Sequence, residues 1–474
     1  MAQHCGYVIE VKNLRKHPNA DRLQLLDVFG TTTTVGLDVK VGDIGIYFPT
    51  DLQLSVEYCA VNHLCRKNPK DGTIDTGYMD ADKRNVSAIR LRGEKSDGLY
   101  VPISTLETFG NVSKVKVGDT IDIFNGVEIC CKYIPRSNKV AASGPKDLKA
   151  GKKKKIAPIA PLFSEHIDTS QLAYNLSVFK PGDEIEITLK MHGTSQRTGY
   201  LPVLKGYRRT LLDRILRRPG TPIYDWGYIS GTRRTILGNY DGGFYGSNEF
   251  REQHSKIFEG KLWKGETVYY EVVGFTHTGT PIMGDADNKK LNDKEFIKQY
   301  GETTRFSYGC EPNPKNLVVA DPNANEVVGV KFPLAPQSDI YVYRMTMTNE
   351  DGDTIDYTPD FMRYRCEQMG VKTVPVFAKA ILNEESRFVI NDVSTEPGDL
   401  GAYVLKMAEF FCDGPDPVGK THVREGAVVR IINRPKFTAY KHKNFSFKVL
   451  EGIIKDAAAA PDMEEAQETI NESI

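Results

Sequence analysis

The segment Thr188-Leu-Lys-Met-His-Gly-Thr-Ser195 carries the pattern that decides the interpretation of this chain. The preceding alternation from Ile185 predicts a β-strand that ends at Lys190. Gly193 then allows a turn and a close backbone approach to a ligand such as a nucleotide. A lysine followed three residues later by a glycine is common by composition alone. The pattern therefore needs support from the rest of the chain.

Three downstream segments supply groups that a nucleophilic lysine would need. They are Tyr269-Tyr-Glu271-Val-Val-Gly274, Arg424-Glu425-Gly426-Ala-Val-Val-Arg430 and Tyr440-Lys441-His-Lys443-Asn444. A nucleophilic lysine must lose its proton, so it is expected to be partly buried or close to other cations. The lysines at 441 and 443 would point to one face of a strand. Two acids and two lysines around Lys190 predict chemistry on a phosphate, with a divalent cation.

Length and composition set few limits on function. The 474 residues predict two or three domains, and 62 basic residues balance 62 acidic ones, so net charge indicates no partner. The sequence predicts no signal peptide, and it lacks the run of about 18 apolar residues that a membrane helix needs. Eight cysteines without paired spacing indicate reduced thiols. We therefore expect a cytoplasmic protein without a membrane partner.

The organisation predicted from the sequence is α+β. Residues 1–145 contain short apolar runs separated by turn residues, which predicts a small β-barrel. Residues 146–156 are a basic linker, 157–455 alternate strand patterns with a few helical ones, and 456–474 are an acidic tail. Basic stretches at 152–155 and 205–218 are typical either of solvated surface or of nucleic-acid binding, and both interpretations stay open.

The four segments around Lys190, Glu271, Glu425 and Lys441, in this order, resemble motifs I, III, IV and V of the covalent nucleotidyltransferases. That superfamily contains RNA ligases, DNA ligases and mRNA capping enzymes. Further likenesses are to RNA-ligase sequences before the nucleophile (Phe163–Thr169), to the aromatic motif IIIa (Tyr341–Arg344) and to tRNA-binding OB domains (His17–Leu23). An OB domain before a ligase domain is similar to the Deinococcus-type RNA ligases.

The resemblance implies an N-terminal OB-type β-barrel followed by an antiparallel-sheet, ATP-grasp-like nucleotidyltransferase domain. It implies these roles: Lys190 as the nucleophile, Gly193 as part of the nucleotide site, Glu271 and Glu425 as ribose or metal ligands, Lys441 and Lys443 as phosphate ligands, and Tyr343 as the ring on adenine. An arginine after motif I meets the ribose or the RNA end in many relatives. Ser230-Gly-Thr-Arg233-Arg234 departs from that pattern, and Arg233 is our choice.

Each of these residues also has an ordinary structural interpretation. Lys190 could be a surface lysine, Glu271 half of a salt bridge, Tyr343 a core residue, and the two lysines at 441 and 443 a solvated strand edge. His192 is expected to be structural, and His17 to serve the turn at Pro18. Cys59, His63 and Cys65 lie close together, but no second ligand pair follows, so a structural zinc is not expected.

The predicted function is an ATP-dependent RNA ligase that seals 3′-OH and 5′-phosphate ends at nicks in duplexes. ATP and Mg²⁺ or Mn²⁺ are the expected cofactors, RNA or an RNA–DNA nicked duplex is the expected partner, and a monomer is the expected state. A GTP-dependent capping enzyme, a DNA ligase and a non-catalytic RNA-binding protein on a ligase scaffold are the alternatives.

Overall fold

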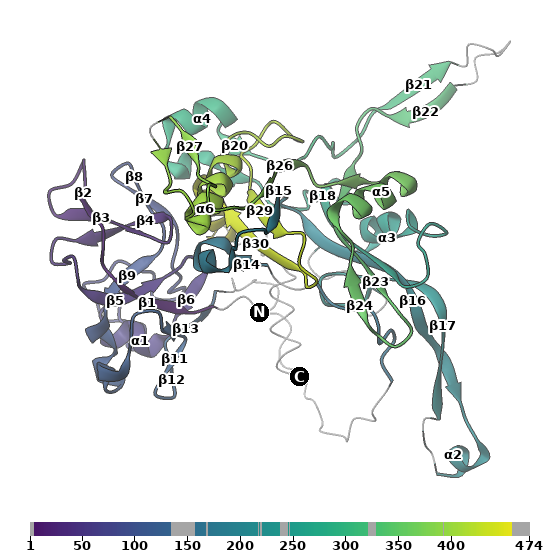
Figure 1. Cartoon of the computed structure of the whole chain (residues 1–474), viewed down its shortest axis with the longest axis horizontal. Helices are drawn as coiled ribbons and strands as arrows, with labels where there is room; N and C mark the ends of the chain where they lie inside the picture. Colours follow the sequence, from purple (N-terminus) through teal and green to yellow (C-terminus); the bar gives the residue numbers. More distant parts are fainter. Residues whose placement is uncertain are drawn as a thin grey trace.

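The computed structural model describes residues 4–133, 157–166, 169–216, 218, 220–237, 245, 247–320, 329–391 and 393–456. Figure 1 shows the N-terminal region, in purple, beside a larger region that carries the long strands. The predicted linker and nearly all of the predicted acidic tail lie outside the described residues. No helix among the described residues is long and apolar enough to cross a membrane.

The N-terminal region is built from short antiparallel strands. Its main sheet has the order β10-β1-β5-β9, and β2-β3-β4 form a second sheet. The strands are β1 (Gly6–Glu10), β2 (Leu14–Lys16), β3 (Leu23–Val28), β4 (Thr31–Gly36), β5 (Ile44–Phe48), β6 (Leu52–Leu54), β7 (Ile89–Leu91), β8 (Glu94–Ser96), β9 (Leu99–Pro102), β10 (Thr120–Ile121), β11 (Ile123–Phe124), β12 (Val127–Glu128) and β13 (Cys130–Lys132), with one α-helix, α1 (Val56–Val61). None of the described sheets closes on itself, so the OB barrel stays a prediction.

The first large sheet carries Lys190 and has the order β14-β30-β29-β15-β26. Its strands are β14 (Ser170–Gln171), β15 (Glu184–Lys190), β26 (Val376–Ile381), β29 (Gly426–Ile431) and β30 (Thr438–Lys443). Helix α6 (Leu400–Cys412) packs on this sheet through a buried apolar face, and the Asp399 side chain caps its N-terminus. Helix α7 (Phe445–Asp456) follows β30 directly.

The second large sheet carries Glu271 and has the order β17-β16-β18-β23-β24, with β25 beside β23. Its strands are β16 (Thr194–Arg208), β17 (Thr221–Gly231), β18 (Glu266–Gly274), β23 (Ser338–Thr348), β24 (Thr354–Asp356) and β25 (Lys372–Thr373). Helices α3 (Glu249–Lys256) and α5 (Pro359–Met369) lie against it, and their apolar side chains enter its core. The β16–β17 hairpin projects far from the body and ends in α2 (Leu211–Ile215).

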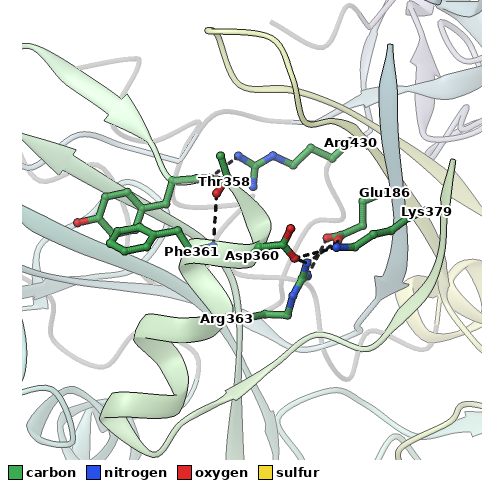
Figure 2. A network of polar contacts seen from close by, with 8 residues as sticks. Glu186, Thr358, Asp360, Phe361, Arg363, Lys379 and Arg430 are labelled. Carbon is green, nitrogen blue, oxygen red and sulfur yellow. Dashed lines mark hydrogen bonds and ion pairs between the residues drawn. The ribbon is translucent and has the colours of Figure 1, made fainter. Parts of the chain in front are cut away.

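A polar network joins the two large sheets through α5 (Figure 2). Arg363 of α5 donates two hydrogen bonds to buried Glu186 of β15, at 3.1 and 2.8 Å, and a third to Asp360. Lys379 of β26 reaches the same two carboxylates, at 3.5 Å from Glu186 and 2.8 Å from Asp360. Arg430 of β29 adds a hydrogen bond of 2.9 Å to the Tyr357 carbonyl before α5. The network therefore ties β15, the strand of Lys190, to the helix that packs on the second sheet.

The remaining elements are short. They are β19 (Ala286–Asp287), α4 (Lys294–Tyr300), β20 (Thr303–Thr304), the hairpin β21 (Asn316–Ala320) and β22 (Gly329–Pro333), and the hairpin β27 (Val389–Ile390) and β28 (Val393–Ser394). The 3₁₀ helices are η1 (Ile103–Phe109), η2 (Val112–Lys114), η4 (Leu172–Tyr174), η5 (Leu176–Val178) and η8 (Asn288–Leu291). The mixed α+β architecture with antiparallel sheets confirms the predicted fold class.

The N-terminal region contacts the rest of the molecule through charged and aromatic groups. Lys448 of α7 lies 2.5 Å from Asp97, which is 4% exposed. Tyr174 of η4 packs its ring on Tyr7 and Phe29, with centroids 4.5 and 5.0 Å apart. These contacts bring the N-terminal region against η4, which precedes the strand of Lys190, and against α7, which follows β30.

Candidate active site

A cavity of about 550 Å³ lies where the N-terminal region meets the two large sheets. Seven of the eight predicted site residues line it: Lys190, Gly193, Arg233, Glu271, Glu425, Lys441 and Lys443. The eighth, Tyr343, is not among its lining residues. The N-terminal region contributes Tyr7, Asp51 and Lys132 to the same cavity. Residues spread over more than 250 positions of sequence therefore share one polar pocket.

Lys190 and Glu425 form the central ion pair of the cavity. Lys190 is the last residue of β15, and its register partner on β29 is Gly426, the residue after Glu425. The Lys190 Nζ lies 2.7 Å from Glu425 Oε1, and the two side chains are 25% and 3% exposed. A buried carboxylate thus holds Lys190 at the wall of the cavity, and the Lys190 amine remains accessible from the cavity.

Glycines permit close packing at two of the predicted motifs. A Cβ at Gly193 would lie 2.4 Å from the Val272 carbonyl and 2.9 Å from Glu271 Cγ. A Cβ at Gly426 would lie 2.1 Å from the His442 carbonyl. Such distances are incompatible with any side chain unless backbone moves. Gly193 therefore makes room for the strand that carries Glu271, whereas the sequence suggested room for a nucleotide.

The two lysines of β30 reach the cavity from one face of the strand, as their spacing predicted. Lys443 Nζ lies 2.6 Å from Glu451 Oε2 and 3.9 Å from Glu425 Oε1. Lys441 pairs in register with Val428 of β29 and with Gln171 of β14. The cavity wall thus concentrates positive charge beside Lys190, which suits a polyphosphate.

Carboxylate oxygens in the cavity would suit a divalent cation. The Glu425 Oε2 atom is buried and has no hydrogen-bond partner among the described residues, although His192 Nδ1 lies 3.9 Å away. Glu271 lines the same cavity. No group of three or more His, Cys, Asp or Glu side chains in the described part of the chain could hold a metal. A cation at Glu425 and Glu271 would therefore need further ligands from phosphate and water.

Tyr343 stands behind the cavity, on β23 of the second sheet. Its hydroxyl lies 2.9 Å from the Ser195 hydroxyl, and the His166 ring meets it edge-on with centroids 5.1 Å apart. Ser195 is the register partner of Glu271. Tyr343 thus connects the segment before the nucleophile, the segment after it and the acid strand. The position of its ring on adenine stays a prediction.

His192 lies under the ion pair and has a structural environment. Its backbone N–H donates to the Tyr308 hydroxyl at 2.7 Å, and its ring packs edge-on against Phe306 and Phe447. Burial lowers the pKa of His192 to about 4, against the opposing effect of the Glu425 carboxylate. A neutral imidazole therefore supports the cavity floor at neutral pH.

Arg233 lines the cavity, whereas the neighbouring Arg234 does not. Arg234 Nε instead lies 3.9 Å from Glu165 Oε2. The Arg233 carbonyl accepts a hydrogen bond of 3.2 Å from the backbone N–H of His166. The loop of Arg233 is therefore paired with the segment that precedes the nucleophile strand.

Arg197 organises this corner, and sequence reasoning missed it. The guanidinium, on a residue that is 2% exposed, donates to the carbonyls of Thr232 at 3.0 Å and Arg234 at 3.1 Å. It also donates to the carbonyls of Phe163, at 2.8 Å, and Ser164, and it lies over the Phe163 ring. One buried arginine thus holds both segments that flank Arg233. No local signal marked Arg197, because its neighbours Gln196 and Thr198 in β16 are polar as well.

The other singled-out residues have structural partners. Cys59 and Cys65 are buried thiols whose pKa values are raised by burial, and exposed His63 contacts Asp75 at 3.0 Å. His17 is fully buried, with its Nδ1 accepting from the Asn19 N–H at 3.1 Å and its Nε2 3.2 Å from the Leu91 carbonyl. His17 therefore fastens the turn at Pro18 to the β7–β8 hairpin.

Sequence comparison identifies no relative. No known protein family matches the sequence, and neither does any protein of curated function. Comparison with solved structures does find similar chains. An RNA ligase from Naegleria gruberi, solved in variant form with AMP and Mn, matches with a TM-score of 0.52 and 14% identity over 94% of this chain and 98% of that chain.

The chain shares the fold of this RNA ligase. A second variant of the Naegleria gruberi enzyme with AMP and Mn has a TM-score of 0.51 and 14% identity over the same shares of the two chains. A third, an apo form, has a TM-score of 0.51 and 15% identity over 94% of this chain and 98% of that chain. Because the match spans nearly the full length of both chains, it includes the N-terminal region as well as both large sheets. At this identity the likeness concerns the fold.

Proposed function

We propose that this protein is an ATP-dependent RNA ligase that becomes adenylylated on Lys190. The observation that carries the proposal is the accessible Lys190 amine, 2.7 Å from buried Glu425, in a cavity also lined by Lys441 and Lys443. A fold shared with an RNA ligase that was solved with AMP and Mn supports it. A lysine in this setting is suited to attack phosphorus, because the two lysines beside it would stabilise the negative charge of the phosphates.

Three steps follow from this assignment. The neutral amine of Lys190 attacks the α-phosphorus of ATP, a phosphorus–nitrogen bond forms and pyrophosphate leaves. The AMP group then passes to the 5′-phosphate of a nucleic-acid strand, which releases the lysine. Finally, a 3′-hydroxyl attacks that activated phosphate and AMP departs. Lys441 and Lys443 would hold the phosphates throughout, and Arg233 would meet the ribose or the RNA end.

The cofactors are ATP and Mg²⁺ or Mn²⁺. Glu425, with its unpartnered buried oxygen, and Glu271 would hold the divalent cation together with the phosphates. The cation would neutralise charge on the triphosphate and on the leaving group. Glu425 has one oxygen on Lys190, so its second oxygen, which has no hydrogen-bond partner among the described residues, is the one proposed for the cation.

The substrate is a break in a duplex with an RNA 3′-hydroxyl, and the N-terminal region is the proposed nucleic-acid module. As an OB-type domain of the Deinococcus kind it would grip the strand near the break through phosphate contacts and base stacking. Tyr7 and Lys132 already border the cavity, so a strand bound to this region would be delivered to Lys190.

The deciding experiment is nucleotide transfer to the protein. Full-length protein is incubated with α-labelled ATP or GTP and Mg²⁺ or Mn²⁺, denatured, and examined for bound label, beside Lys190→Ala. Label from ATP alone that is absent in Lys190→Ala is the expected result. Label from GTP would make the protein a capping enzyme. No label from either nucleotide, with RNA binding intact, would leave a binding protein on a ligase scaffold.

A further inference from the structure

The turn from Ser307 to Cys310 holds a tyrosine in a backbone conformation that large side chains rarely adopt. The Cys310 N–H donates to the Ser307 carbonyl at 2.8 Å, which closes a β-turn. The two central residues, Tyr308 and Gly309, have φ values of 49° and 78°. A turn with positive φ at both positions favours Asn, Asp or Gly at the first of them, because a larger side chain is strained there. Contacts outside the turn must therefore hold Tyr308 in place.

The contacts of the Tyr308 side chain account for this conformation. Tyr308 is 3% exposed, and its ring meets the His422 ring edge-on with centroids 4.6 Å apart. Its hydroxyl accepts a hydrogen bond of 2.7 Å from the backbone N–H of His192. Burial raises the pKa of this hydroxyl well above its ordinary value, so the hydroxyl keeps its proton at neutral pH. The turn thus places one neutral acceptor against the segment that follows Lys190.

The segment that donates this hydrogen bond connects the two large sheets. Strand pairing in the first sheet ends at Lys190, and pairing in the second sheet begins at Thr194. Residues 191–193 therefore lie outside both sheets, and the Tyr308 hydroxyl holds the middle residue, His192. Because Lys190 directly precedes this connection, the hydrogen bond bears on the direction of the Lys190 side chain. Small displacements of a reacting group lower a rate strongly.

The turn is itself fixed against the strand that carries Glu271. A Cβ at Gly274, the last residue of β18, would lie 2.7 Å from both the Cβ and the Sγ of Cys310. Such a distance leaves no room for a side chain between β18 and the turn. The position of Tyr308 is therefore tied to the second large sheet, and its hydroxyl ties the connection after Lys190 to the same place.

We propose that Tyr308 is a positioning residue for the nucleophile. Its hydroxyl holds the connection 191–193 and so sets the direction in which the Lys190 amine meets the α-phosphorus of ATP. The strained turn is retained because only a side chain of this length, starting from this backbone conformation, brings a neutral acceptor to the His192 N–H. The inference rests on the proposed function, since it concerns transfer of AMP to Lys190.

The variant Tyr308→Phe tests the inference, because it keeps the ring and leaves the His192 N–H without its acceptor. We expect the rate of self-adenylylation at saturating ATP to fall by about tenfold or more, while the half-saturating ATP concentration changes by less than about twofold. Transfer of label from α-labelled ATP to the full-length protein measures both. The matched control is Tyr270→Phe, which removes another buried hydroxyl, 2.9 Å from the Thr198 hydroxyl, and should leave the rate nearly unchanged.

A second measurement separates positioning from general damage to the site. Sealing of a nick whose 5′ end is already adenylylated does not require attack by Lys190, so Tyr308→Phe should keep this rate within about threefold of the wild type. Equal losses in self-adenylylation and in this sealing step would overturn the inference. So would a labelled wild type and a Tyr308→Phe variant that is labelled equally fast. A wild type that takes no label would instead overturn the proposed function itself.

Discussion

The two walls of the cavity are built in different ways. The first large sheet presents its groups directly, since Lys190 ends β15, Glu425 precedes β29 and Lys443 ends β30, all at one edge in register. The second wall depends on buried support. In that wall, Gly193 permits a close approach of the strand that carries Glu271. Arg197 holds the loop that carries Arg233. The chemistry is thus concentrated in one wall and its positioning in the other.

The largest loss should follow removal of charge from the first wall. Glu425→Gln keeps the size of the side chain but leaves Lys190 without its acid, and it removes a cation ligand. We expect lysyl-adenylate formation to fall by about 100-fold or more, as for other groups aimed at transition-state charge. Rates of label transfer from ATP measure it. Glu451→Gln removes the carboxylate 2.6 Å from the Lys443 amine and should cost far less; equal losses in the two variants would contradict a central role for Glu425.

A steric change should be next in size. Gly193→Ala places a Cβ 2.4 Å from the Val272 carbonyl, so the turn and β18 must separate. We expect a loss of about 1–3 kcal/mol in the free energy of unfolding, the usual cost of overpacking, and a lower adenylylation rate. Denaturant unfolding measures the first effect. Gly206→Ala, on β16, places a Cβ with nothing within 4 Å and should leave both properties unchanged.

Loss of the support from Arg197 should affect ATP binding more than the chemical step, and by less than the loss expected for Glu425→Gln. Arg197→Lys cannot supply the four hydrogen bonds of a planar guanidinium, so the segments beside Arg233 should loosen. We expect KM for ATP to rise by about tenfold, at a smaller change in kcat, since about 1.4 kcal/mol corresponds to that factor. Arg365→Lys, at a buried arginine paired with Glu266, is the control for general destabilisation. Equal KM effects in both would deny Arg197 a positioning role.

The smallest effect on activity should come from a histidine remote from the chemistry. Burial lowers the pKa of His254 to about 4 from 6.5, and its Nε2 lies 2.8 Å from the Ser338 hydroxyl. Because the unfolded chain binds this proton more readily, its stabilising effect is full above pH 6.5 and is lost as pH falls towards 4.

His254→Gln should therefore flatten the pH dependence of the unfolding midpoint between those values and leave the adenylylation rate at pH 7.5 nearly unchanged. Thermal unfolding at a series of pH values measures it. An unaltered pH profile in the variant would show that His254 does not contribute to acid sensitivity.

Local patterns in the sequence predicted much of the first wall. The strand that ends at Lys190 and the strand with Lys441 and Lys443 on one face both follow from periodicity within a few residues. The resemblance of the ordered motifs to those of covalent nucleotidyltransferases then indicated which of these side chains belong to the site. The closed barrel expected for 1–145 was a weaker inference, because strands of two to six residues say little about which neighbours they pair with.

By itself, the sequence determined which side chains were available: one lysine at a strand end, acids before glycines and paired lysines on a strand. Tertiary structure alone decided that seven of the eight predicted site residues line one cavity and that Tyr343 stands behind it. The tertiary structure also explains why position 193 must be a glycine and why Arg197 is needed to hold the segments beside Arg233. The reason is physical, since the reach of a Cβ and the partners of a buried guanidinium are contacts between segments far apart in sequence, which no local pattern encodes.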